Sequence, residues 1–157
     1  MVTFSDVISS EDALREVIPA PRDSGAWDKS LGFIDPHAAA FIAKSPFAMI
    51  ATTSAGGKMD ISPKGDPAGF VHVLDEHTLV IPDRPGNGRA DTFRNLLENP
   101  RISVYFLVPG RSETLRVNGS ARLVKDQWLL EQMAVKGRPA LLAIAVTVEE
   151  SFFHCAK

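Results

Sequence analysis

The sequence contains a single cysteine, Cys155, among 157 residues. This excludes an intramolecular disulfide framework and a zinc site built from several cysteines. There is no apolar run of about 18 residues, the length that a membrane-spanning helix needs. The first ten residues lack the basic-then-apolar order of a secretory signal. We therefore expect a cytoplasmic protein that is held together by its core and has no contact with membranes.

An excess of positive charge is also missing. Seventeen Lys and Arg residues stand against 19 Asp and Glu residues, which gives a net charge of −2. This balance argues against a protein dominated by nonspecific nucleic-acid binding. The two tryptophans, Trp27 and Trp128, are interpreted as packing residues rather than as platforms for stacked bases. What is present is 45% hydrophobic and 23% charged residues, an ordinary globular composition in a chain long enough for one domain with a core.

The order of apolar runs and turn signals predicts many strands and few helices. We expect helices near residues 11–18, 36–44, 89–98 and 126–135, and strands near residues 47–53, 58–62, 70–74, 79–81, 101–108, 115–124 and 141–148. Residues 19–32 are rich in Pro, Gly and charge and are expected to wrap the domain, with Trp27, Leu31 and Phe33 as anchors. Strands joined mostly by short turns predict a mostly antiparallel, closed sheet with helices at its edges.

Two segments, Ser62–Asp66 and Pro82–Arg89, combine turn formers with charged residues. Each follows an expected strand, and the second leads directly into a helix. The first turn of a helix leaves N–H groups without intrahelical partners, and its dipole favours an anion. Gly86 and Gly88 let the backbone approach a ligand closely. The cations that can bind a phosphate here are Lys64, Arg84, Arg89 and Arg94.

The same residues also have an ordinary structural interpretation. Arg84 and Arg89 can pair with Asp83 and Asp91 in solvent, while the glycines only form a turn. The segment is neither a complete Rossmann fingerprint nor a Gly-x-x-x-x-Gly-Lys phosphate loop. Spacing alone leaves both interpretations open.

Other reactive side chains point to no separate chemistry. The histidines lack metal-ligand spacing, so no metal site is expected. Ser62 is not part of a Gly-x-Ser-x-Gly elbow, which argues against a hydrolase. Asp60 and Asp66 are expected in turn or helix-end roles rather than as an acid–base pair. The histidines are His37, His72, His77 and His154.

Three ordered motifs carry a family resemblance: Ser-Pro-Lys-Gly-Asp at 62–66, Ile-Pro-Asp-Arg-Pro-Gly-Asn at 81–87 and Leu-Arg-Val-Asn-Gly at 115–119. Over about residues 35–155, the sequence resembles the pyridoxamine 5′-phosphate oxidase-like family of split-barrel proteins that bind flavin mononucleotide (FMN). The resemblance implies an α+β protein, mostly β, with a six-stranded antiparallel split β-barrel and peripheral helices. It also implies a homodimer with FMN in two clefts between the subunits. Residues 35–157 would then form the FMN-binding domain, and residues 1–34 an N-terminal helix and wrapping segment.

The resemblance also implies site residues by motif position. Lys64 and Arg89 would hold the FMN phosphate, and Ser62 would lie beside the isoalloxazine or ribityl group. Glu113 and Thr114 would reach across from the partner subunit. Arg116 and Asn118 belong to a motif but receive no role. The implied FMN contacts are Ser62, Lys64, Ile81, Pro82, Asp83, Arg84, Asn87, Gly88 and Arg89.

The function implied is that of an FMN-dependent oxidoreductase, which acts on an unidentified small molecule by hydride or electron transfer through the flavin. No catalytic residue is assigned, because the flavin carries such chemistry. Two alternatives stay open: a non-catalytic FMN storage or sensor module, and the same barrel with a deazaflavin or haem. The substrate contacts of the vitamin B6 oxidases are not recognisable, so that activity is not expected. Relatives in the subgroup tend to continue past the segment that corresponds to residues 153–157, into a stretch that covers the site.

Overall fold

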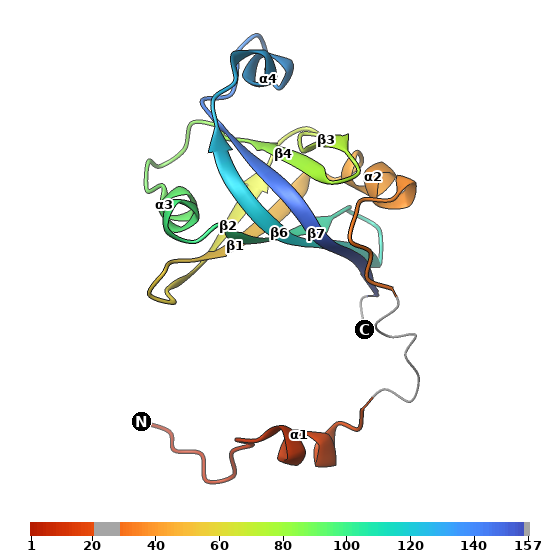
Figure 1. The fold of residues 1–157 in the computed structure, drawn as a ribbon, viewed down its shortest axis with the longest axis vertical. Coiled ribbons are helices and arrows are strands. Elements are labelled where there is room, and N and C mark those ends of the chain that lie inside the picture. The colour runs from red at the N-terminus through yellow and green to blue at the C-terminus, as the bar shows by residue number, and fades with distance from the viewer. Residues whose placement is uncertain (21–28, 156–157) are drawn as a thin grey trace.

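The computed structural model describes residues 1–20 and 29–155. Its main element is one antiparallel sheet of seven strands in the order β2-β1-β5-β6-β7-β4-β3 (Figure 1). The strands are β1 (Phe47–Thr53), β2 (Met59–Gly65), β3 (His72–Asp75), β4 (Thr78–Pro82), β5 (Arg101–Leu107), β6 (Glu113–Val124) and β7 (Ala143–Cys155). The helices are α1 (Glu11–Val17), α2 (Pro36–Ile42), α3 (Asp91–Glu98) and α4 (Gln127–Gln132). The expected fold class, a split antiparallel barrel with peripheral helices, is confirmed.

The sheet differs from the expectation in two respects. It has the seven strands that the turn signals predict rather than the six that the family resemblance implies, because the short strand β3 pairs with β4 at one edge. Among the described strands, no pairing joins this edge to β2 at the other edge, so the sheet is curved but not closed. The edge strands are β2, which pairs only with β1, and β3, which pairs only with β4.

Alternation along the strands builds the core. Every second residue of β1, β5 and β6 points into the barrel, as the two-residue period of a strand requires. Each large apolar side chain that is fully buried contributes about 1.5–3 kcal/mol. The largest such side chains are Phe106, Ile42, Ile50, Leu79, Ile81, Leu115 and Ile144.

The longest strand pair, β6 with β7, spans both halves of the barrel (Figure 1). Its register shifts at Gly119: Asn118 pairs with Glu150, whereas Gly119 pairs with Val148, which leaves Glu149 as the extra residue of a bulge. A Cβ atom at Gly119 would collide with the carbonyl of Thr147. The bulge therefore requires glycine, and the bend that it introduces lets one hairpin serve two halves of the sheet.

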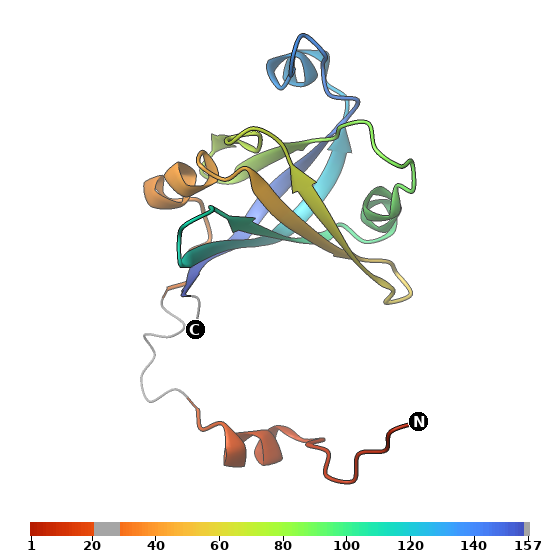
Figure 2. The ribbon, with the colours of Figure 1, turned by 180° about the vertical axis from the view of Figure 1, so that it is seen from behind.

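The N-terminal region meets the sheet through residues 29–34. The backbone of Leu31 exchanges two hydrogen bonds with Ser151 of β7, and the Ser151 hydroxyl donates to the carbonyl of Phe33. Two expected anchors thus lie against the barrel, whereas Trp27 falls outside the described residues. None of the residues of α1 is buried, and Figure 2 shows this helix apart from the sheet.

The connection from β6 to β7 carries α4. Leu129 and Met133 pack against Val80 and Ala143 in a small cluster of their own. Trp128 was expected to pack, but 61% of it is exposed, because it lies on the outer side of this short helix. None of the helices in the described part of the chain combines the length and apolar character needed to span a bilayer.

Candidate functional site

A cavity of about 710 Å³ lies between β2, the loop that follows β4, and the first turn of α3. This volume falls in the range of about 300–1,000 Å³ that is typical of ligand sites. In Figure 1, α3 and the loop before it lie beside the β1–β2 hairpin. The lining residues are Asp60–Lys64, Asp83–Phe93 and Leu141.

Lys64 and Arg89 come from separate elements and line the same cavity. The Nζ atom of Lys64, on β2, lies 3.5 Å from an Asp83 oxygen and 5.4 Å from the centre of the Phe93 ring. The Nε atom of Arg89 donates to Asp91 at 2.7 Å, and 71% of the Arg89 side chain is exposed. This hydrogen bond lowers the pKa of Asp91 from its ordinary value. The two segments that were expected to provide cations, residues 62–66 and 82–89, therefore contribute to one cavity.

Arg84 is placed differently, because its guanidinium is already engaged in the wall of the cavity. Its Nε donates to Asp66 at 2.7 Å, and Nη2 donates to the carbonyl of Met133 at 2.8 Å. Nη1 is buried and has no hydrogen-bond partner in the described part of the chain. Arg84 thus joins the end of β2 to the end of α4. The pKa of His72 is lowered by burial and by the nearby positive charge of Arg84.

The first turn of α3 has no side-chain cap among the described residues. Ala90, at the N-cap position, has φ 58° and ψ 24°, a left-handed conformation that disfavours any residue with a Cβ atom. The preceding turn is held by Asn87, whose side-chain oxygen accepts from the N–H of Arg89 at 3.1 Å, and by Gly88 at φ 72°. The start of α3 therefore presents N–H groups at the cavity without satisfying them from a side chain.

Of the nine residues implied as FMN contacts, seven line the cavity, whereas Ile81 and Pro82 do not. Both of these are buried in β4, and Ile81 belongs to the barrel core. Arg94, offered as a further cation, is also not among the lining residues. The ion-pair interpretation holds for Arg89 with Asp91, but Arg84 pairs with Asp66 instead of Asp83. The seven lining residues are Ser62, Lys64, Asp83, Arg84, Asn87, Gly88 and Arg89.

Other lining residues were not identified from the sequence. Asp60 lies within β2 rather than in a turn, and it accepts a hydrogen bond of 2.9 Å from the hydroxyl of Thr92 in α3. Strand alternation would have revealed it, because residues 60, 62 and 64 share one side of β2. Leu141 had no such signal, since the long connection after α4 brings it to the cavity.

The unassigned motif at 115–119 has a structural explanation. Gly119 permits the bulge, and the bulge sets Glu150 opposite Asn118. Asn118 and Arg116 both donate to Glu150, which also accepts from Ser30 at 2.8 Å. The Ser30 hydrogen bond is the main reason that the pKa of Glu150 is lowered. The motif therefore links β6, β7 and the wrapping segment.

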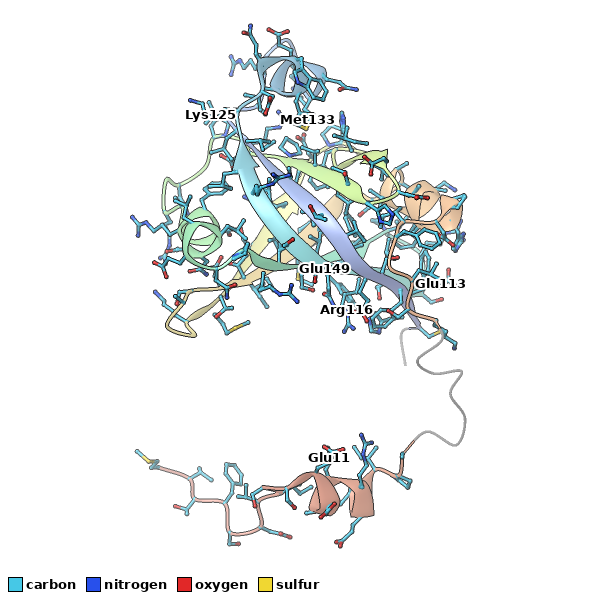
Figure 3. The ribbon with its side chains drawn as sticks, in the orientation of Figure 1. Glu11, Glu113, Arg116, Lys125, Met133 and Glu149 are labelled. Carbon is cyan, nitrogen blue, oxygen red and sulfur yellow. The ribbon has the colours of Figure 1, made fainter. Side chains whose placement is uncertain are left out.

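Glu113, expected to reach a site from a partner subunit, does not line the cavity of its own chain. Figure 3 labels Glu113 at the beginning of β6, where it pairs with Cys155 at the end of β7, and it is not among the residues that line the cavity. Thr114, next to it, hydrogen-bonds Tyr105 at 2.6 Å. A role across a subunit interface stays a prediction for both. In the described residues, no group of three or more His, Cys, Asp or Glu side chains could hold a metal ion.

One curved, open antiparallel sheet with few helices places the chain in the split-barrel class of α+β folds. Comparison with protein-family models gives a match over residues 34–155 to the family described as pyridoxamine 5′-phosphate oxidase. The chain belongs to this family. No curated protein matches the chain in sequence.

Solved structures with the same fold share little sequence with this chain. HupZ of Group A Streptococcus is 20% identical, with a TM-score of 0.64 over 78% of this chain and 95% of that one. An FMN-binding protein from Syntrophomonas wolfei is 14% identical, with a TM-score of 0.57 over 73% and 82%. An F420 reductase is 16% identical, with a TM-score of 0.51 over 73% and 94%. These likenesses establish the fold.

Proposed function

We propose that the chain binds FMN in this cavity and acts, as a homodimer, as an FMN-dependent oxidoreductase on a small molecule. One observation carries the proposal: Lys64 and Arg89, from two elements far apart in sequence, line one cavity together with the uncapped start of α3. A phosphate group at this place would accept hydrogen bonds from both cations and from the N–H groups of the helix. Each hydrogen bond to a charged group contributes about 1.5–3 kcal/mol.

Binding a phosphate requires Arg89 to exchange Asp91 for the ligand. The exchange is favourable because an exposed ion pair contributes little net free energy, and 71% of the Arg89 side chain is exposed. Lys64 is more enclosed, with 21% of its side chain exposed. It would therefore act as a fixed charge, while Arg89 closes over the phosphate.

The remaining residues of the cavity orient the cofactor and shield it from water. Arg84 holds the wall through Asp66 and Met133, and so keeps the ends of β2 and α4 in place. The hydroxyl of Ser62 lies on the same strand as Lys64, where it can bond the polyol chain or the ring. Bound FMN would supply the hydride or electron transfer, whereas the protein supplies position and electrostatics.

A deazaflavin is the second candidate, because one structure with this fold is named an F420 reductase. The phosphate argument applies to any phosphorylated flavin and so does not separate the two. It disfavours haem, which has no phosphate for Lys64 and Arg89 to bind.

The homodimer is supported by exposed apolar residues on the β1–β2 edge of the sheet. Met59 and Ile61 are 67% and 66% exposed, and Phe47 on β1 is 39% exposed. The register of the hairpin puts these three residues on one face of it, and exposed apolar side chains on one face are typical of an interface. Ile61 also lines the cavity, so a second copy seated on this edge would cover the cofactor as well. Light scattering should give about twice the chain mass of 17.0 kDa; a cofactor-loaded monomer would contradict this part of the proposal.

Two measurements test whether the cofactor is FMN: the colour of the purified protein and the effect of the phosphate group on affinity. The protein should purify yellow and should release FMN on denaturation, identified by chromatography. The stripped protein is then titrated with FMN and with riboflavin, which has the same ring but no phosphate. FMN should bind at least about tenfold more tightly, because riboflavin forgoes one or more charge-assisted hydrogen bonds. Equal affinities would refute the phosphate site.

Catalysis is tested separately from binding. Oxidation of a nicotinamide donor by the loaded protein, with an artificial electron acceptor, would favour an enzyme over a storage or sensor module. Absence of turnover with a range of donors, at full FMN occupancy, would favour the module.

A further inference from the structure

Asp60 is the acidic residue of the cavity that forms no salt bridge within the described part of the chain. Asp83 and Asp91 also line the cavity, but they pair with Lys64 and Arg89. No Lys, Arg or His nitrogen in the described part of the chain forms a salt bridge with Asp60. Its only side-chain hydrogen bond there is the one from Thr92 at 2.9 Å. Asp60 is half-buried and lines the cavity from near the start of β2.

Cations and carboxylates are equal in number among the residues that line the cavity. The cations are Lys64, Arg84 and Arg89, and the carboxylates are Asp60, Asp83 and Asp91. Arg84 is already neutralised by Asp66, which does not line the cavity. A phosphate monoester adds about −1.5 to −2 charges near neutral pH. Once Lys64 and Arg89 hold that phosphate, the carboxylates in the rest of the cavity have no cation left to balance them.

We propose that Asp60 is a specificity-determining residue, which makes the cofactor-loaded cavity reject anionic electron acceptors and donors and admit neutral or cationic ones. This inference rests on the proposed function, because it needs a phosphorylated cofactor in the cavity. Two like charges a few ångströms apart at a partly buried site repel enough to change affinity by about fivefold or more. Two apolar residues that line the same cavity, Phe93 and Leu141, suit an uncharged ring.

The experiment uses two quinones with the same ring system, 1,2-naphthoquinone and its 4-sulfonate, which carries a negative charge. The FMN-loaded protein is reduced with one equivalent of dithionite without oxygen, and its reoxidation by each quinone is followed by stopped flow. The cofactor gives up two electrons, and the quinone takes them with two protons to become the hydroquinone. The quantity measured is the ratio of the two second-order rate constants. Comparing this ratio between proteins cancels the difference in reduction potential between the quinones.

The main variant is Asp60→Asn, which removes the charge but keeps an oxygen that accepts from the Thr92 hydroxyl. The matched control is Glu16→Gln, which makes the same change of net charge on α1, where the side chain is exposed. We expect Asp60→Asn to lower the preference for the neutral quinone about fivefold, and Glu16→Gln to leave it unchanged. Raising the salt from about 20 mM to about 0.5 M should lower the preference of the unmodified protein, because salt screens the repulsion.

Several outcomes would overturn the inference. The first is an equal ratio of the two rate constants in Asp60→Asn and in the unmodified protein, which includes the case in which both rate constants change by the same factor. If Asp60→Asn does not fold, the salt series decides: the inference is also wrong if the preference of the unmodified protein for the neutral quinone does not change with salt. FMN affinity is measured alongside by fluorescence. A protein that fails to bind FMN refutes the proposed function and this inference with it, whereas a loaded protein with an unaltered ratio refutes only the role of Asp60.

Discussion

The helices α2 and α3 begin in opposite ways. At the start of α2, the Asp35 side chain accepts from the N–H of Ala38 at 2.7 Å, and Pro36 occupies the first helical position. At the start of α3, Ala90 stands in a left-handed conformation and has no side-chain cap among the described residues. At α2, a side chain satisfies one of the first N–H groups, and Pro36 has none to satisfy. At α3, no such side-chain cap is found among the described residues.

The two helices also have different surroundings: α2 packs into the core, whereas α3 begins at the cavity. Phe41 and Ile42 of α2 are buried in the barrel core, so that this helix contributes mainly to stability. The start of α3 lies in the wall of the cavity, beside Lys64 and Arg89. The comparison teaches that a missing cap is informative when cations converge on the same place, since a helix start of that kind is suited to an anion.

The largest effect should come from Arg89→Ala. We expect FMN affinity to fall about 10–100-fold, the equivalent of one hydrogen bond between charged groups, while circular dichroism stays unchanged. The control is Arg101→Ala, which removes a similarly exposed pairing, with Glu149. An unaltered FMN dissociation constant in Arg89→Ala would contradict the phosphate assignment.

A second substitution makes α3 resemble α2. Ala90→Asp places a carboxylate at the N-cap position, where it competes for the free N–H groups and repels the phosphate. We expect FMN binding to weaken about tenfold, by calorimetry. Ala90→Asn has the same shape without the charge and should weaken binding less. Equal losses in the two variants would mean that bulk, rather than charge, is responsible.

The reverse change, Asp35→Ala, removes the cap of α2. The free energy of unfolding should fall by about 1 kcal/mol, the usual value of an N-cap, as measured by urea denaturation. FMN affinity at full folding should not change. If it did, the separation between a stabilising helix start and a binding one would be wrong.

The smallest effect concerns Asp91, whose pKa is lowered by the hydrogen bond from Arg89. When a phosphate takes Arg89 away, this pKa should rise toward its ordinary value. Binding is then accompanied by proton uptake at Asp91, so this group favours binding as the pH falls. An NMR titration of the Asp91 carboxyl with and without FMN measures the change. A pKa that stays low in the loaded protein would mean that Arg89 remains paired.

The sequence predicts the strands and the location of the cavity, but not the partners of its charges. Alternating apolar residues located most of the sheet, because that pattern reflects burial on one face. The predicted strand 141–148 was too short for β7, which runs to Cys155, since the bulge opposite Gly119 interrupts the alternation. Arg84 was expected near Asp83 because the two are adjacent, yet it pairs with Asp66, which the fold brings from another strand end. Pairings between distant loops depend on tertiary geometry, which local patterns do not encode.

The position of β7 in the sheet sets an order of events during synthesis. This strand lies between β6 and β4, so the β3–β4 hairpin has no edge to join until residues 143–155 have left the ribosome. At about 5–20 residues per second, the hairpin waits several seconds with an unpaired edge. The nascent chain therefore passes through a stage in which β2, β1, β5 and β6 can pair while one half of the barrel is still missing. In that interval, the unpaired edge of the hairpin is exposed to pairing with other chains.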